Sequence, residues 1–171
     1  MPKESNAISL LRKDHIEVKL LFKQAEHAGG KNKVVIFNMI KASLTVHAQI
    51  EEEIFYPAVK KARSEQVRDE VREGYEEHKQ IKRLLAALSK ITPADETYDM
   101  KLKVLKEDVE HHVKEEEDEM FPDAKKYLRE DRLAELGEEL EHRKKQLQAH
   151  QNGVARKNGG DSESASVRSA K

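Results

Sequence analysis

The chain has 171 residues, of which 38% are charged and 37% hydrophobic, with 7 Gly, 4 Pro and no Cys. Its 32 basic and 33 acidic residues nearly cancel, so a formal net charge of -1 gives no indication of binding to nucleic acid or to an anionic membrane. Without cysteine the chain has no disulfide, no iron–sulfur cluster and no thiol nucleophile. The scarcity of helix breakers among many Glu, Lys, Leu and Ala residues predicts an all-α protein.

Apolar residues recur at steps of three and four along most of the chain, which is the spacing of one helix face. In chain order this pattern predicts four long helices over about residues 5–28, 33–62, 65–91 and 95–127. Ser5 is the expected N-cap of the first helix, and Gly29 and Gly30 end it. Short joints between long helices predict an antiparallel up-down-up-down four-helix bundle over about residues 5–128.

Pro57 and Pro122 fall inside the second and fourth predicted helices. A proline removes one backbone hydrogen bond and clashes with the preceding turn. Each should therefore kink its helix or end it early, and the sequence does not say which.

The pattern continues beyond the bundle into an additional C-terminal helix over about 130–150, which is highly charged and has a thinner apolar face. Residues 151–171 are polar and rich in Gly and Ser, and we expect them to form a disordered tail. Residues 1–150 are then one domain. No long apolar run predicts a membrane span or signal peptide, so we expect a cytoplasmic protein, as a monomer or weak dimer.

Two stretches of the sequence occur twice in similar form. DHIEVKLL at 14–21 resembles EHKQIKRLL at 77–85, and HAQIEEEIFYP at 47–57 resembles HVKEEEDEMFP at 112–122. Three related pairs of ionisable residues follow from the repeat, the first 63 positions apart and the other two 65: His15 and His78, His47 and His112, and Glu51 and Glu116. Two similar helical hairpins facing each other would give a bundle with pseudo-twofold symmetry.

These six histidines and glutamates lie in line with the apolar stripes of their own helices. Burying an unpaired glutamate costs several kcal/mol, so two glutamates at repeated core positions indicate a bound cation. The His-x-x-x-Glu spacing directs both side chains from one helix face, and the lone His15 and His78 face them from the other helices. We therefore predict that His15, His47, Glu51, His78, His112 and Glu116 are metal ligands.

Six protein ligands are too many for a structural zinc site, which usually takes four. Divided by the repeat, they provide two histidines for each of two metal ions and two carboxylates that can bridge them. Histidine and carboxylate ligands without thiolate suit non-haem iron or manganese. With a bridging oxide or hydroxide, each of two iron ions would keep an open position for a small ligand such as dioxygen, nitric oxide or peroxide.

The motif His15, His47-x-x-x-Glu51, His78 and His112-x-x-x-Glu116, with Phe-Tyr-Pro57 and Met-Phe-Pro122 after the glutamates, resembles the hemerythrin family. The similarity covers about residues 8–128 and is greatest to the bacterial HHE cation-binding branch. It implies an oxo-bridged di-iron centre in an antiparallel four-helix bundle. With glutamate closing both pairs, the pattern is closer to members linked to iron–sulfur cluster repair and nitrosative stress than to oxygen carriers.

Two other side chains compete for places in the site. His111 precedes His112 and has Glu115 four residues on, but the repeat offset and the distance to Pro122 favour His112. Tyr75 lies one turn before His78, where it could either donate a hydrogen bond to the site or pack in the core.

The sequence leaves three functions open. The first is a di-iron protein that binds or senses a small oxidant under oxidative or nitrosative stress. The second is a di-iron enzyme that reduces nitric oxide or peroxide, or an iron donor for cluster repair. The third is a structural helical module that docks a partner. The chain encodes no thiol relay, so sustained turnover would need an external electron donor, and this favours the first function.

Overall fold

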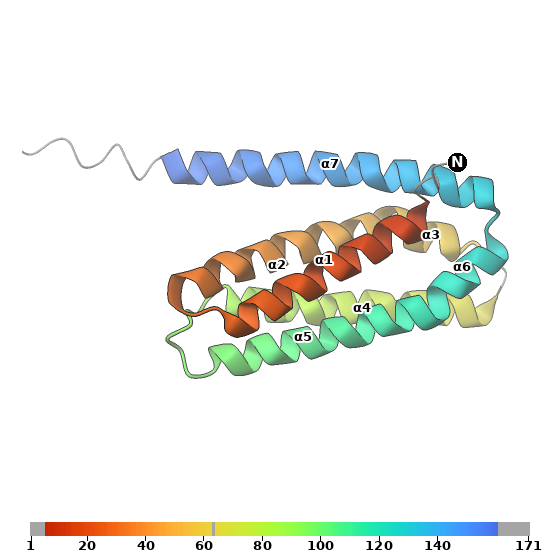
Figure 1. Ribbon diagram of the computed structural model, residues 1–171. Helices are drawn as coiled ribbons and strands as arrows, with labels where there is room; N and C mark the ends of the chain where they lie inside the picture. Colours follow the sequence, from red (N-terminus) through yellow and green to blue (C-terminus); the bar gives the residue numbers. More distant parts are fainter. Residues whose placement is uncertain (1–5, 63, 161–171) are drawn as a thin grey trace, which may run out of the picture.

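The computed structural model describes residues 6–62 and 64–160, and this part of the chain is helical without any β-strand. Helices α1 (Ala7–His27) and α2 (Gly30–Ile50) form one hairpin, and α4 (Glu65–Leu88) and α5 (Tyr98–Glu115) form a second. Figure 1 shows the four helices side by side, with the two hairpins facing each other. The predicted all-α antiparallel bundle is confirmed.

Local polar contacts fix where the helices start. The Asn6 side chain accepts a hydrogen bond from the Ser9 backbone N–H at 3.0 Å, so Asn6 caps α1, whereas Ser5 lies outside the described residues. Ser64 caps α4 in the same way through Val67 N–H. Gly30 has φ +52°, a backbone conformation that favours glycine, and it opens α2 directly after the turn from α1.

Both helices that carry a His-x-x-x-Glu pair widen into a π-helical turn. These turns are η1 (Glu51–Phe55) and η2 (Glu116–Met120), and the short helices α3 (Tyr56–Val59) and α6 (Phe121–Tyr127) follow them. Pro57 and Pro122 stand in the first turns of α3 and α6. A π turn bonds each N–H to the fifth residue back and so accommodates one extra residue. The helical path therefore continues through each proline by way of a π turn, an outcome that the sequence did not predict.

Tyr75 completes the hydrogen bonding of the first π turn. In the π pattern the Glu52 carbonyl would accept from residue 57, but proline has no N–H to donate. The Tyr75 hydroxyl donates to the Glu52 carbonyl instead, at 3.1 Å. Tyr75 thus supports the backbone beside the site and does not extend into it.

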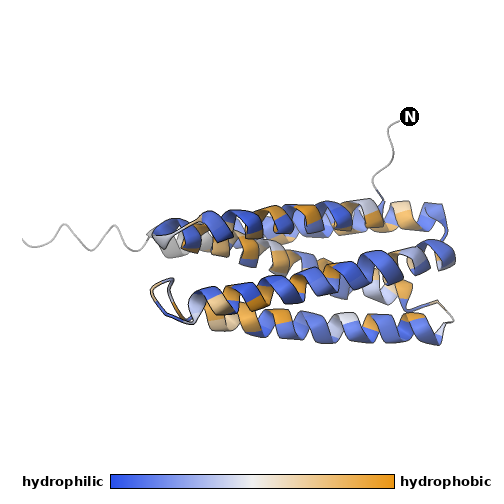
Figure 2. Ribbon diagram, turned by 60° about the horizontal axis from the view of Figure 1, so that its bottom comes forward, coloured by the Kyte–Doolittle hydropathy of each residue, from blue (hydrophilic) through white to orange (hydrophobic). Residues whose placement is uncertain are grey.

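The hydrophobic core forms two clusters, one toward each end of the bundle. One contains Leu11, Ile50 and Phe121, and the other contains Val18, Leu44 and Val109. In Figure 2 the hydrophobic residues lie mainly on the faces of the helices that turn toward one another. Along α1, α4 and α5–η2, the ionisable residues predicted as ligands lie between residues of the two clusters. None of the described helices is long and apolar enough to cross a membrane.

Helix α7 (Glu130–Gly160) lies along the α1–α2 hairpin and leaves the α4–α5 hairpin uncovered (Figure 1). Its buried residues Leu133, Leu136 and Leu140 join the first cluster, and burial of each leucine contributes about 1.5–3 kcal/mol. The predicted C-terminal helix is confirmed, but it ends at Gly160 and not at about residue 150. Residues 151–160 are helical where a disordered tail was expected, because they extend an existing helix without a new nucleation step and Gln151 donates to the Ala42 carbonyl. Residues 161–171 lie outside the described residues.

Candidate metal centre

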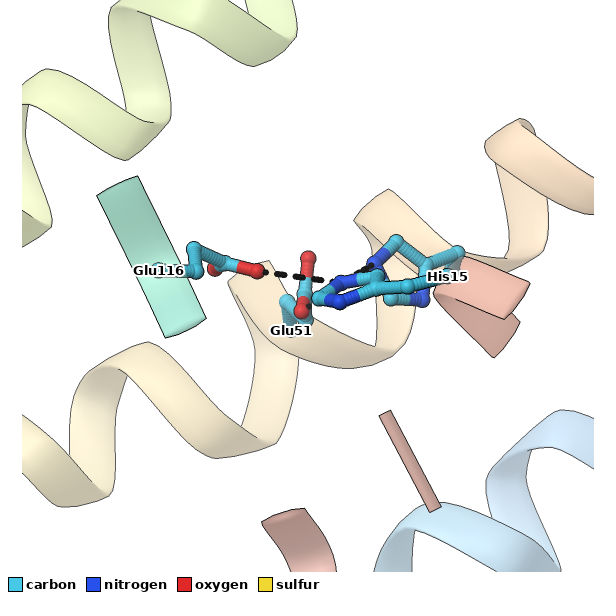
Figure 3. Close-up of side chains that lie close together, drawn as sticks. His15, Glu51 and Glu116 are labelled. Carbon is cyan, nitrogen blue, oxygen red and sulfur yellow. Dashed lines mark hydrogen bonds and ion pairs between the residues drawn. The ribbon is translucent and has the colours of Figure 1, made fainter. Parts of the chain in front are cut away.

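Six side chains converge in the middle of the bundle, and they are the six that the sequence singles out. Every one is buried, and the most exposed of them is 6% accessible. They come from α1, α2, η1, α4, α5 and η2: His15, His47, Glu51, His78, His112 and Glu116. Figure 3 shows Glu51 and Glu116 directed from different helices toward the His15 ring.

The four histidines form one pair in each hairpin. His15 Nε2 and His47 Nε2 are 3.2 Å apart in the first hairpin, and His78 Nε2 and His112 Nε2 are 3.1 Å apart in the second. Each pair therefore directs two ring nitrogens at one small volume, as two ligands of one metal ion do.

Each glutamate carboxylate reaches imidazoles of both hairpins. Glu51 Oε1 lies 3.2 Å from His47 Nε2, and Glu51 Oε2 lies 3.3 Å from His78 Nε2. Glu116 Oε2 lies 3.3 Å from His15 Nε2 and 3.6 Å from His112 Nε2. Both carboxylates thus occupy positions from which they could bridge two cations.

Three oxygens of these carboxylates have no hydrogen-bond partner in the described structure, namely both of Glu51 and Oε2 of Glu116. An unpartnered buried polar atom costs about 1–3 kcal/mol, and more when it is charged. Buried carboxylate oxygens without donors, beside converging imidazole nitrogens, form a ligand set that fits metal cations.

The two carboxyl groups differ in the metal-free protein. Burial and the nearby Glu116 charge raise the pKa of Glu51 well above its ordinary value. Burial also acts on Glu116, but His112 and His15 outweigh it and hold its pKa below the ordinary value. The pKa values of the two carboxyl groups are thus displaced in opposite directions, and bound cations would favour the ionised form of both.

The outer nitrogen of each histidine contacts a further carboxylate, a support that sequence reasoning missed. The Nδ1 contacts are His15 with Glu117 at 2.9 Å, His47 with Asp14 at 3.4 Å, His78 with Glu52 at 2.9 Å and His112 with Glu77 at 2.7 Å. Such contacts fix the ring orientation and raise the basicity of the ligand nitrogen. The repeat contained the signal, because an acid precedes both lone histidines and another acid follows both glutamates.

One of these carboxylates is tied to the C-terminal helix. Asp14 is buried on α1, and Lys144 of α7 donates a hydrogen bond to its Oδ1. Burial would raise the pKa of Asp14, but His47 and Lys144 together lower it. Helix α7 thereby supports the ring orientation of His47 from outside the four-helix bundle.

Replacing Lys144 by alanine should lower the free energy of unfolding by about 1–3 kcal/mol, because a buried carboxylate loses its cationic partner. Urea denaturation of the metal-free protein measures this loss. Lys145→Ala is the matched control, since Lys145 is exposed and pairs with Glu141 one turn away, a contact worth about 0.3–0.5 kcal/mol. Equal losses in the two variants would show that Asp14 does not depend on α7.

A tyrosine distinguishes the two halves of the site, and sequence reasoning missed it. The Tyr56 hydroxyl donates to Glu116 Oε1 at 2.8 Å, and its ring stacks on His78 with centroids 5.4 Å apart. Its counterpart in the repeat is Phe121, which stacks on His15 at 5.8 Å. Burial and the neighbouring carboxylates raise the pKa of Tyr56, so the phenol keeps its proton. The change from Phe-Tyr-Pro to Met-Phe-Pro in the repeat was the available signal.

The structure separates the two neighbouring histidines on α5. His112 is 2% exposed and lies in the centre, whereas the side chain of His111 is 64% exposed and points away from it. The repeat offset in the sequence favours His112 over His111, in agreement with this placement.

Comparison with known proteins gives three findings. Residues 6–124 match the family described as Hemerythrin HHE cation binding domain. A DNA nickase of Nostoc sp. is 28% identical over 153 residues, which are 89% of this chain but only 43% of that protein. Uncharacterized protein Rv2633c of Mycobacterium tuberculosis is 26% identical over 145 residues, covering 83% of this chain and 87% of that protein. The chain thus spans less than half the length of its Nostoc relative.

The fold also matches a solved structure. The crystal structure of a Hemerythrin HHE cation binding domain-containing protein, the Rv2633c homolog from Mycobacterium kansasii, superposes with a TM-score of 0.79. Sequence identity is 24%, over 88% of this chain and 92% of that one, so this likeness establishes the fold. With the family match over residues 6–124, it shows that the chain belongs to the hemerythrin HHE cation-binding domain family.

Proposed function

We propose that the six converging side chains hold two non-haem iron ions with a bridging oxide or hydroxide, and that the protein binds or senses a small oxidant. The observation that supports this most directly is the pair of buried carboxylates, Glu51 and Glu116, each placed between histidines of both hairpins. Two ions would give every unpartnered carboxylate oxygen in the centre a partner.

The donor set is compatible with iron and disfavours metals that prefer oxygen ligands alone. Four imidazoles and two carboxylates without thiolate suit iron or manganese, whereas magnesium and calcium prefer oxygen ligands throughout. When bound, two iron ions supply open coordination positions and electrons for a small oxidant. The protein residues orient these ligands, and the surrounding apolar clusters limit the access of water.

A small internal cavity supports a ligand of few atoms. It has a volume of about 10 Å³, and its lining consists of three histidines, four apolar residues and two further polar residues: His15, His47, His112, Val18, Leu44, Val109, Val113, Asp14 and Ser43. A cavity of that size holds roughly one water-sized molecule. Dioxygen, nitric oxide or peroxide would fit after slight adjustment, and a metabolite-sized substrate would not.

A groove between α1 and α5 offers such a ligand a path from solvent. Its volume is about 540 Å³, and it shares His15, Val18, Val109 and Val113 with the internal cavity. The groove and the cavity therefore border the same side chains. Motion of valine side chains would be enough to admit a diatomic molecule.

We also propose that the residues up to about 150 act as one domain. The C-terminal helix buries leucines against the first core cluster, and its Lys144 supports Asp14 behind a proposed ligand. Removing α7 would therefore affect the centre as well as the core.

Purified protein should contain about two iron ions per chain and show the near-ultraviolet bands of a bridged di-ferric centre. Metal analysis and absorption spectroscopy test this directly. Colourless protein that takes up no iron under reducing conditions would contradict the proposal.

Stopped-flow mixing with nitric oxide or hydrogen peroxide, with and without an added reductant, distinguishes the remaining functions. A binding or sensing protein should give one spectral change per centre and then stop. Repeated turnover in the presence of reductant would overturn the binding function and establish an enzyme that reduces the oxidant.

A further inference from the structure

A second group of ligand-type side chains lies on the surface, outside the buried centre. It consists of Glu77 on α4 and of His111 and Glu115 on α5. His111 Nε2 is 2.9 Å from Glu115 Oε1 and 3.6 Å from Glu77 Oε1, and one ligand atom from each residue lies within 4.8 Å of the others. One imidazole with two carboxylates is a ligand set for a divalent transition metal.

The surface cluster shares a residue with the support of the buried centre. While Glu77 Oε1 faces His111, Glu77 Oε2 contacts His112 Nδ1 at 2.7 Å. His112 is itself one of the six converging residues. A single carboxylate therefore connects the solvent-facing cluster to the centre.

A narrow cavity of about 10 Å³ continues from this cluster toward the centre. Glu77 and Glu115 line it together with Glu116, whose side chain is 2% exposed and whose Oε2 has no hydrogen-bond partner. Six glutamates, one glycine and one methionine form the lining, and no basic residue is among them. A buried carboxylate with one unpartnered oxygen, at one end of an acidic passage, can accept a cation.

The buried centre needs such a passage, because all six converging side chains lie within the core. Moving a bare dication through apolar side chains would cost tens of kcal/mol, whereas exchange of water for carboxylate oxygens can proceed in steps. The groove between α1 and α5 is less suitable for a cation, since its lining carries Lys19 and Lys114 beside its acids.

The repeat shows that this cluster occurs on one side of the molecule only. At the offset of 65, His111 and Glu115 correspond to Val46 and Ile50, and both of these are buried in the core cluster that α7 helps to form. The α4–α5 face that α7 leaves uncovered is thus the face that carries the ligand-type residues (Figure 1).

We propose that Glu77, His111 and Glu115 form a loading site, which takes a divalent cation from solvent and transfers it along the acidic passage to Glu116. The identity of the cation as ferrous iron rests on the proposed function. The site and the transfer rest on the geometry of the cluster and the passage.

The experiment uses the full chain, stripped of metal by chelation, and the double variant His111→Asn, Glu115→Gln. The side chain of His111 is 64% exposed and that of Glu115 is 32% exposed. Glu77 is left unchanged because its carboxylate contacts His112 Nδ1. Titration with Co²⁺ measures stoichiometry by visible absorption, and anaerobic stopped-flow mixing with Fe²⁺ measures the rate of loading. His142→Asn, Glu141→Gln makes the same chemical changes on exposed α7 and serves as the control.

We expect the double variant to lose one weakly bound Co²⁺ and to load Fe²⁺ about tenfold or more slowly, with unchanged final iron content. The control should match wild type. Unchanged loading rate would overturn the proposal even if the weak Co²⁺ disappeared, and so would a fall in the final iron content, because the cluster would then belong to the centre itself. Normal loading without any reaction toward oxidants would instead contradict the proposed function.

Discussion

Replacing Glu51 by glutamine is expected to remove most of the bound iron and, at the same time, to stabilise the metal-free protein. The side chain is completely buried, and both of its oxygens lack a hydrogen-bond partner. Glutamine keeps the shape but cannot bridge two cations as a carboxylate does. In the absence of metal it removes a buried acid, and the free energy of unfolding at pH 7 should rise by about 1–3 kcal/mol. Iron analysis and urea denaturation measure the two effects.

The gain in stability should depend on pH in a defined direction. Burial raises the pKa of Glu51 above its ordinary value of 4.5, so the folded protein binds a proton that the unfolded chain releases. The metal-free wild type therefore loses stability as pH rises above about 4.5, whereas the glutamine variant lacks this loss. The two proteins should be equally stable near pH 4 and diverge toward neutral pH.

Glu53→Gln is the matched control for this experiment. Glu53 lies in the same π turn, but its side chain is 40% exposed and pairs with Arg143. We expect it to retain full iron content and to change stability by less than about 0.5 kcal/mol. Wild-type iron content in Glu51→Gln would show that Glu51 is not a ligand.

Gly74→Ala is expected to destabilise the protein, although alanine ordinarily stabilises a helix relative to glycine. A Cβ atom at this position would lie 2.7 Å from the Tyr56 hydroxyl oxygen and 3.0 Å from its Cζ. Tyr56 is fully buried and hydrogen-bonded to Glu116, so it has little freedom to move. We expect a loss of about 1–3 kcal/mol, which for a chain of this size lowers the melting temperature by about 2–4 °C per kcal/mol.

Gly153→Ala provides the comparison within the same protein. Gly153 is also helical, but nothing lies within 4 Å of the position its Cβ would take. Removing the backbone freedom of a helical glycine should stabilise the protein by about 0.5–1 kcal/mol. The same substitution should thus have opposite signs at the two positions. A neutral Gly74→Ala would mean that Tyr56 does not occupy the space beside α4.

Much of the architecture was predictable because the repeat encodes it twice. Helical spacing with short joints specified the bundle, and the offset of 65 residues together with the distance to Pro122 separated His112 from its neighbour His111. The glutamates were recognisable because carboxylates rarely occupy core positions without a partner. Each of these inferences depends on patterns along the chain, which a single sequence contains.

The remaining features depend on contacts between helices. Glu52 and Glu117 look like members of a solvated acidic run, and only the packing of α4 and α1 brings histidines to them. The role of Tyr56 depends on the space left by Gly74 on another helix. The helical end of α7 was missed because its glycines and polar residues leave the helix marginal by propensity alone, and the contact of Gln151 with α2 is not visible in the sequence.

The π turns also determine how the protein can tolerate changes in chain length. Each is equivalent to a one-residue insertion into an α-helix, and both hairpins carry it at the same place, beginning at the glutamate of the His-x-x-x-Glu pair. Deleting one residue within η1 would restore α-helical spacing and rotate the following side chains by about 100° relative to His47. Tyr56 would then turn away from Glu116, although no functional residue had been substituted. A relative with a one-residue gap at this position in an alignment would therefore have different side chains around its metal centre.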